Sequence, residues 1–171
     1  MWGACMYNEL TKVDIEKMKE EIAERRARIP ALREEVRRTR EYGDLSENDE
    51  YRSAKREYNK NNGRIRYLEN MINTAKIIDV DSAEGTVGLF DYVTVYYPED
   101  EETRVVRLVT TLRNDVFSDC ISKDSPFGRA LLGAKVGDTV QVQVREGYSY
   151  PVTVQKIEKG QDDDSLPIMK Y

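Results

Sequence analysis

Apolar residues recur at alternating intervals of three and four over two stretches of the chain. The first series holds Ile15, Met18, Ile22, Arg25, Ile29, Leu32, Val36 and Thr39, and the second holds Tyr51, Ala54, Tyr58, Asn61, Ile65, Leu68, Ile72 and Ala75. This spacing is typical of the seam of a coiled coil. The two series mirror each other, so Ile15 would face Ala75 and Thr39 would face Tyr51. We therefore predict an antiparallel helical hairpin over residues 7–79.

The pattern changes after Ile78. Apolar and polar residues now alternate in "TVGLFDYVTVYY", "TRVVRLVTT" and "TVQVQVREGYSYPVTVQKI", which is typical of antiparallel strands joined by hairpins. Between these runs, Ser125 can cap a short helix that has Pro126 at its first position. We predict an α+β chain in which residues 80–159 form a small antiparallel β domain with one short helix. The acidic segment 160–171 predicts a flexible tail.

Composition narrows the chemistry. The 171 residues are 35% charged with a net charge of −5, so the chain as a whole is no generic polyanion binder. It has no histidine and two isolated cysteines, Cys5 and Cys120, so any bound metal should be a hard ion held by oxygen. No run reaches transmembrane length, and the first residues do not form a signal peptide. We expect a cytoplasmic protein, with a monomer as the default state.

The stretch between the two helical patterns, "EYGDLSENDEY", holds five carboxylates in residues 41–51. One explanation is structural: Gly43 ends the first helix, Asp44 or Ser46 caps the second, and acids favour the positive end of a helix dipole. The other is functional. Asp44 and Glu47 are three residues apart, so both can point the same way from a turn and hold one face of a Mg²⁺ ion.

Basic residues flank this acidic turn. The second helix carries six of them between residues 52 and 66, namely Arg52, Lys55, Arg56, Lys60, Arg64 and Arg66, with Glu57 as the only acid. The first helix adds Arg37, Arg38 and Arg40. These residues form either a solvated coiled-coil face or a stripe that follows a nucleic-acid backbone. The seam tyrosines Tyr51 and Tyr58 are more typical of packing than of base stacking.

Three segments together resemble a known family. They are "GDLSENDEYRSAKRE" at the turn, "RIRYLENMINTAKIID" at the close of the hairpin and "ISKDSPFGRALLGAKVGD" in the second domain. Over about residues 7–159 the chain resembles the bacterial Gre-type transcript cleavage factors, the GreA/GreB family. The resemblance implies a factor that is not itself an enzyme. Its FKBP-like second domain would dock at the rim of the secondary channel of bacterial RNA polymerase, and its coiled coil would enter that channel.

The resemblance also implies roles for individual residues. Asp44 and Glu47 match the acids that help hold the second Mg²⁺ of the polymerase active site, where the polymerase itself cuts backtracked RNA. The residues expected to support this tip are Gly43, Ser46, Asn48 and Tyr51. Those expected near the nascent RNA 3′ end are Arg37, Arg40, Arg52, Lys55 and Arg56. Those expected to bind the polymerase are Ser125, Pro126 and Phe127.

Two departures from the family pattern leave alternatives open. The segment "RNDVFSDCIS" stands where the family commonly has "EAD" before the "IS" strand. Asp49 adds an acid where small residues are usual, and extra acid at the tip also marks Gre-like paralogues that inhibit polymerase. The alternatives are therefore such an inhibitor or a plain coiled-coil interaction module. A prolyl isomerase and an autonomous nuclease are weaker alternatives, and the sequence does not separate GreA-like from GreB-like cleavage.

Overall fold

The computed structural model describes residues 8–41, 48–80, 83–163 and 165–169. It divides into two compact units, which are considered separately. The first, over Ile15–Lys76, contains nearly all of the two long helices, and the second contains the β domain from Ile77 onward together with the short segment Glu9–Asp14. Two short strands, β1 (Asn8–Leu10) and β2 (Ala75–Ile77), pair with each other in a separate two-stranded sheet.

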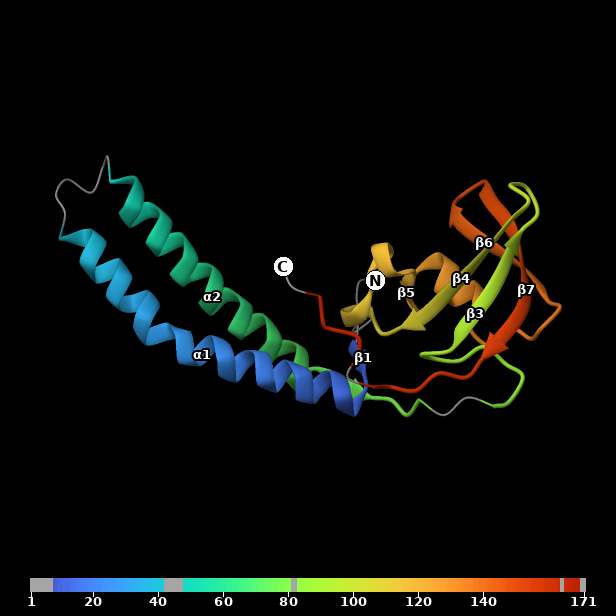
Figure 1. Ribbon diagram of the computed structural model, residues 1–171, viewed down its shortest axis with the longest axis horizontal. Coiled ribbons are helices and arrows are strands. Elements are labelled where there is room, and N and C mark those ends of the chain that lie inside the picture. The colour runs from blue at the N-terminus through green and yellow to red at the C-terminus, as the bar shows by residue number, and fades with distance from the viewer. Residues whose placement is uncertain (1–7, 42–47, 81–82, 164, 170–171) are drawn as a thin grey trace, which may run out of the picture. The chain divides into compact units, whose positions relative to one another are not determined.

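The predicted helical hairpin is confirmed (Figure 1). Helix α1 spans Lys12–Arg40 and helix α2 spans Asp49–Asn73. A capping box starts α1, because Thr11 Oγ1 accepts a hydrogen bond from the Asp14 amide at 3.1 Å while the Asp14 carboxylate accepts one from the Thr11 amide at 3.0 Å. Both helices are strongly charged, and none of the described helices is long and apolar enough to cross a membrane.

The seam of the hairpin follows the predicted spacing. Met18, Ile22, Ile65 and Leu68 are buried. Nearer the turn Thr39 is also buried, but the apolar seam residues there are half-buried, namely Ile29, Leu32, Val36, Tyr51, Ala54 and Tyr58. Ion pairs between the arms, such as Arg26 with Glu69 at 2.6 Å and Arg28 with Glu57 at 3.2 Å, show the antiparallel register. Apolar burial in this unit is therefore concentrated at the end away from the turn.

A buried polar layer crosses the hairpin near its middle. The Glu21 carboxylate accepts hydrogen bonds from Arg64 Nε and Nη2, each at 3.0 Å, and from Arg25 Nε at 2.6 Å. Asn61 Nδ2 donates to the Arg25 carbonyl oxygen at 3.1 Å. Arg64 was included in the exposed basic stripe on sequence grounds, and that prediction is wrong. Its side chain is only 6% exposed because it turns inward to neutralise Glu21.

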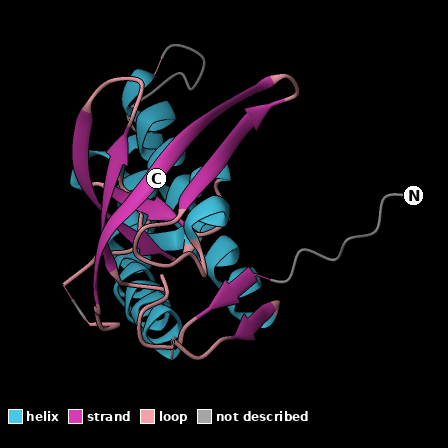
Figure 2. Cartoon of the chain, turned by 90° about the vertical axis from the view of Figure 1, so that its right-hand side faces the viewer, coloured by secondary structure: helices cyan, strands magenta, loops and turns pink. Residues whose placement is uncertain are grey.

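The β domain is built on a five-stranded sheet in the order β5-β4-β3-β7-β6, drawn among the magenta strands of Figure 2. The strands are β3 (Tyr92–Tyr97), β4 (Glu102–Val109), β5 (Cys120–Ser122), β6 (Thr139–Arg145) and β7 (Tyr148–Glu158). Most neighbours are antiparallel, as predicted, but the short strand β5 runs parallel to β4. Two 3₁₀ turns, η1 (Thr111–Arg113) and η2 (Val116–Ser118), make that parallel return possible.

Helix α3 (Pro126–Leu131) packs on this sheet and closes the core. The buried core residues include Val93, Val95, Val106, Leu108, Phe127, Leu131, Val142, Val152 and Val154. Gly128 is required where α3 passes β5, because a Cβ atom there would lie 2.2 Å from the Ser122 carbonyl oxygen. The α+β architecture, a helical hairpin followed by a small β domain with one short helix, therefore agrees with the predicted FKBP-like class.

The described part of the segment 160–171 packs against the β domain. Ile168 is buried, and the Met169 amide donates to the Leu112 carbonyl oxygen at 2.7 Å. Asp162 Oδ1 lies 2.6 Å from Arg113 Nη1, and both side chains are buried. The predicted flexible tail is therefore wrong for these residues. One of its acids, Asp162, therefore has a specific cationic partner within the fold.

Arg113 is the centre of that arrangement. Its side chain is fully buried, and its Nε donates to Asp14 Oδ1 at 2.6 Å. The guanidinium also lies 5.0 Å from the centroid of the Phe90 ring. Within the second unit, one arginine thus joins Asp14, the C-terminal segment and the edge of the β-domain core.

Candidate functional site at the hairpin end

Asn48 holds the two arms of the hairpin together where they meet the acidic turn. It is the N-cap of α2, and its Oδ1 accepts a hydrogen bond from the Tyr51 amide at 2.9 Å. Its Nδ2 donates to the carbonyl oxygen of Thr39, in the last turn of α1, at 2.8 Å. One side chain therefore caps the second helix and fixes the distance to the end of the first.

This cap changes the interpretation of the acidic turn. The prediction that Asp44 or Ser46 caps the second helix is wrong, because Asn48 has that role. Gly43, Asp44, Ser46 and Glu47 lie outside the described residues. Their chemistry is nevertheless clear from the sequence: two carboxylates three residues apart offer the oxygen ligands that Mg²⁺ prefers. The cap of α2 by itself therefore does not explain why the turn carries these acids.

Tyr51 supports the turn through its backbone and its ring. Its amide is bound by Asn48, its side chain is half-buried on the seam, and Lys55 Nζ lies 5.7 Å from the ring centroid. The ring is therefore packed, as expected for a seam residue, and carries a cation on its face.

The basic residues predicted to meet nucleic acid are all exposed: Arg37, Arg40, Arg52, Lys55 and Arg56. They differ in how far their charge is already neutralised. Arg37 donates to Glu34 and also pairs with Glu41, so its hydrogen bond lowers the pKa of Glu34. Among the described carboxylates none pairs with Arg40 or Arg56.

This difference divides the basic surface between the two arms. On α1, Arg37 and Arg38 are paired with carboxylates of their own helix, through Glu34 and Glu35. On α2, Arg52 lies 3.8 Å from Asp49, and the next basic residues along the helix, including Arg56, have no carboxylate partner in the described part of the chain. The second arm therefore presents the larger uncompensated positive charge to a phosphate backbone.

The predicted polymerase-binding residues occupy three different environments. Ser125 is the N-cap of α3, since its Oγ accepts from the Gly128 amide at 2.9 Å, and Pro126 is at the first helical position. Phe127 is 8% exposed and stacks on Tyr97 with ring centroids 6.2 Å apart. Phe127 is thus a core residue, and of the three only Pro126 lines an open groove.

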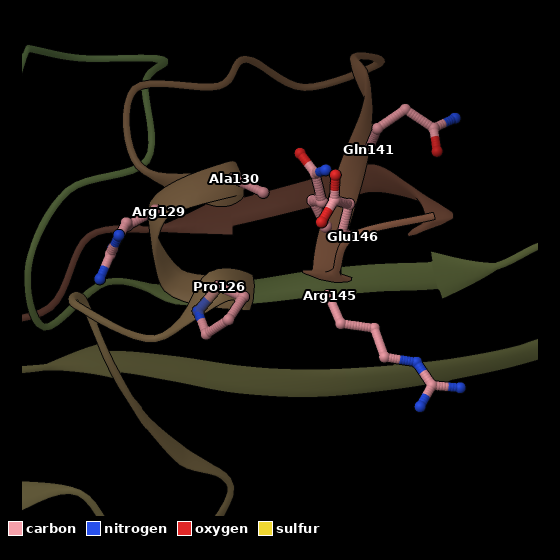
Figure 3. A pocket seen from close by; sticks show the side chains of 7 residues that line it. Pro126, Arg129, Ala130, Gln141, Arg145 and Glu146 are labelled. Atoms are coloured by element: carbon pink, nitrogen blue, oxygen red, sulfur yellow. The ribbon is translucent and has the colours of Figure 1, made fainter. Parts of the chain in front are cut away.

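That groove lies between α3 and the end of strand β6 (Figure 3). It has a volume of about 520 Å³ and is lined by Pro126, Arg129, Ala130, Gln141, Gln143, Arg145 and Glu146. Its surface is mainly polar, with an arginine from each of the two elements. Such a groove suits a polar, acidic or mixed protein surface better than an apolar ligand.

Two features of this domain were missed by sequence reasoning. Arg129 and Arg145 join one groove only because α3 packs beside β6, and no local pattern signals that pairing. Phe117 is completely exposed in η2, inside the segment noted as a departure from the family pattern. No group of three or more Cys, His, Asp or Glu side chains among the described residues is arranged to hold a metal ion.

Comparison with family models gives the class of protein, the transcription elongation factors, and matches both the hairpin and the β domain. The N-terminal domain model of transcription elongation factors matches residues 8–77, and the GreA/GreB C-terminal domain model matches residues 82–159. The chain belongs to the GreA/GreB family.

Two relatives of similar length agree with this assignment. The chain is 41% identical over 140 residues to the transcription elongation factor GreA of Thermotoga neapolitana, covering 81% of this chain and 89% of the relative. It is 38% identical over 152 residues to GreA of Streptococcus gordonii, covering 88% and 94%. Among solved structures, the GreA factor homolog 1 (Gfh1) of Thermus thermophilus is 27% identical, with a TM-score of 0.40 and coverage of 88% of this chain and 98% of that one.

Proposed function

We propose that this chain binds bacterial RNA polymerase through the secondary channel and stimulates the polymerase's own cleavage of backtracked RNA. Asp44 and Glu47 would help hold the second Mg²⁺ of the polymerase active site. Family membership supports the general role. One observation supports the specific role: Asn48 caps α2 and ties the two arms, so the cap of α2 does not depend on Asp44 or Ser46.

The donor set of the turn fits Mg²⁺. A carboxylate pair supplies hard oxygen ligands, and Mg²⁺ retains positions for water and phosphate oxygen. Held by Asp44 and Glu47, a bound Mg²⁺ would supply activation of a water molecule and stabilisation of a leaving oxygen. The chain's own contribution is to carry Asp44 and Glu47 on a turn whose ends Asn48 fixes. Because two carboxylates alone bind Mg²⁺ weakly, the site would be completed by ligands of the polymerase.

The remaining parts of the chain fit supporting roles. The exposed bases of α2, Arg52, Lys55 and Arg56, would contact the phosphates of the nascent RNA 3′ end. Arg37 and Arg40, near the end of α1, would also contact the nucleic acid. The β domain would dock on the polymerase through the surface around Pro126. Ser125 would support this surface by capping α3, and Phe127 by packing α3 onto the core. We propose that the factor works as a monomer in the cytoplasm.

The proposal is tested with a stalled, backtracked elongation complex. The native chain should cut the RNA, whereas Asp44→Asn with Glu47→Gln should still compete for polymerase and fail to stimulate cleavage. Asp49→Asn is the matched control, since it removes one carboxylate just beyond the cap. If the double variant cuts as well as the native chain, the acids have no role in cleavage and the hairpin is a plain interaction module.

Asp49 supports one second candidate, an inhibitor of polymerase. Its side chain is 95% exposed in the first turn of α2, so it adds to the acid presented at the hairpin end. In the same assay an inhibitor would bind, slow elongation and leave backtracked RNA uncut. Asp49→Asn should then relieve the inhibition, whereas for a cleavage factor the same change should leave cleavage nearly unaltered.

A further inference from the structure

A row of aromatic rings lies on the β domain. Phe127 stacks on Tyr97, Tyr97 stacks on Tyr150 with centroids 6.3 Å apart, and Tyr150 lies next to Tyr148 at 6.4 Å. The row begins in the core at Phe127 and ends in solvent, where Tyr148 is 50% exposed. A continuous change from buried to exposed aromatic surface is more typical of a binding surface than of a core margin.

The exposed end of this row forms one wall of a groove. Tyr97, Tyr148, Tyr150 and Pro151 line it together with Glu99 and Asp100, which come from the turn between β3 and β4. Its volume is about 160 Å³. Sites for drug-sized ligands usually exceed about 300 Å³, so this groove has room for a single long side chain.

The charge of the groove indicates which kind of side chain it would bind. Residues 99–102 are four consecutive acids, and of these Glu102 is paired with Arg104 at 2.9 Å. In the parts of the chain that the structure describes, no cation is paired with Glu99 or Asp100. Two uncompensated carboxylates beside three tyrosine rings favour a cation that can both stack on an aromatic face and donate to carboxylate oxygen.

We propose that this groove binds an exposed arginine side chain of a protein partner. Arginine suits it better than lysine because the guanidinium is planar, weakly hydrated and able to donate two hydrogen bonds to one carboxylate. The domain's own arginines show that these rings accept cations: Arg104 lies 6.0 Å from the Tyr97 centroid and Arg145 lies 5.8 Å from that of Tyr148. Neither of these arginines lines the groove itself.

The state of the phenols agrees with this site. Burial raises the pKa of both Tyr97 and Tyr150, with the neighbouring tyrosine adding to the effect in each case. The rings therefore stay protonated at neutral pH and offer a neutral aromatic face, while the two carboxylates supply the charge. The site is independent of the acidic turn of the hairpin, and the proposed role in RNA cleavage can fail without affecting it.

The test uses the full chain and two blocked peptides, acetyl-Gly-Ala-Arg-Ala-Gly-amide and the same peptide with citrulline in place of arginine. Citrulline keeps the shape and removes the charge. Titration followed by NMR should shift the ring signals of Tyr97, Tyr148 and Tyr150 with the arginine peptide and leave them unmoved with the citrulline peptide. Equal shifts with both peptides, or shifts with neither, would overturn the proposal.

Variants locate the binding. Tyr148→Ala removes an exposed ring outside the core, and Glu99→Gln with Asp100→Asn removes the charge. Each should weaken binding of the arginine peptide roughly three- to tenfold, in line with a partly desolvated cation–π or charge-assisted contact. Glu146→Gln, an acid of the neighbouring groove, is the matched control and should leave the affinity unchanged. Loss of binding in the Glu146 variant with retention in the others would assign the peptide to that neighbouring groove and overturn the proposal.

Discussion

The two units of this chain are stabilised by different means. The β domain buries a continuous set of valines, leucines and one phenylalanine between its sheet and α3. The hairpin has few fully buried apolar residues, and near its middle the contact between the arms is polar, through Glu21, Arg64 and Asn61. A buried ion pair contributes little net stability but is costly to mismatch, so it favours one register over its alternatives.

This difference relates to what each unit has to do. A two-helix rod with an apolar seam along its whole length could slide by a turn and still bury similar area, which would displace its end. The Glu21–Arg64 pair and the Asn48 link to Thr39 both oppose such a slide. The β domain needs no equivalent device, because strand pairing and close packing of α3 already define one arrangement.

The largest effect should come from the buried charge cluster around Arg113 in the β domain. Arg113→Leu leaves the carboxylates of Asp14 and Asp162 without their cation. We expect a loss of about 3–5 kcal/mol in the free energy of unfolding, measured by urea denaturation, since uncompensated buried charge is severely destabilising. Arg145→Leu, at an exposed site, should change the same quantity by less than about 0.5 kcal/mol. Equal effects would show that the buried cluster is unimportant.

A matched pair of substitutions tests whether apolar burial stabilises the β domain more than the hairpin. Leu108 in β4 is fully buried, whereas Leu32 on the hairpin seam is half-buried. Leu108→Ala should cost about 2–5 kcal/mol and Leu32→Ala about 1 kcal/mol, because the second leaves a smaller cavity and loses less buried area. Hydrogen exchange can follow the strand amides and the helix amides separately. A cost for Leu32→Ala as large as that for Leu108→Ala would remove the contrast between the units.

The polar layer of the hairpin can be replaced as a whole or in part. Arg64→Leu alone should cost roughly 1–3 kcal/mol in the stability of the helices, less than a fully isolated carboxylate would, because Arg25 still donates to Glu21. Glu21→Leu with Arg64→Leu should recover most of that loss.

The same double variant sharpens the argument about register. If the ion pair selects the register, the double variant should remain stable yet lose precision at the hairpin end. Paramagnetic labels near Arg40 and Asp49 would then report a broader distance distribution than in the native chain. A narrow distribution, identical to the native one, would show that the Asn48 link is sufficient.

Sequence periodicity predicted the hairpin well because a coiled-coil seam is a local pattern that repeats at fixed intervals. It assigned Arg64 to the surface for the same reason: a basic residue one step off the seam looks exposed until its partner, 43 positions away, is known. The parallel strand β5 and the packed C-terminal segment were missed because both depend on contacts between distant residues, namely β4 with β5 and Arg113 with Asp162.

Part of the candidate site could likewise be predicted from the sequence, and part could not. The carboxylates of the turn and the bases on the arms are visible in the sequence, and the five bases expected near RNA are exposed, unlike Arg64. The cap was assigned to the wrong residue because several residues of "GDLSEN" have capping side chains, and sequence alone does not rank them. Ser125 and Phe127 belong to a motif in which Gly128 and Phe127 are required for packing inside the domain. The sequence therefore led us to expect more of this motif at the surface than the structure shows.

The smallest expected effect is on the pH dependence of the hairpin. Burial tends to raise the pKa of Glu21, but the hydrogen bonds and charges of Arg64 and Arg25 outweigh it and hold the pKa below the ordinary value of 4.5. A carboxyl group whose pKa is lowered by folding stabilises the native state above pH 4.5, and that contribution is lost as the pH falls through the folded pKa. Helix stability should therefore fall more steeply below pH 4.5 in the native chain than in the Glu21→Leu, Arg64→Leu variant, which keeps every other carboxylate. Helix stability can be followed against pH by helix-specific hydrogen exchange or circular dichroism. If the two proteins give parallel curves, the Glu21–Arg64 pair contributes nothing to the acid response, and the surface pairs of Glu34 and Glu35 account for it.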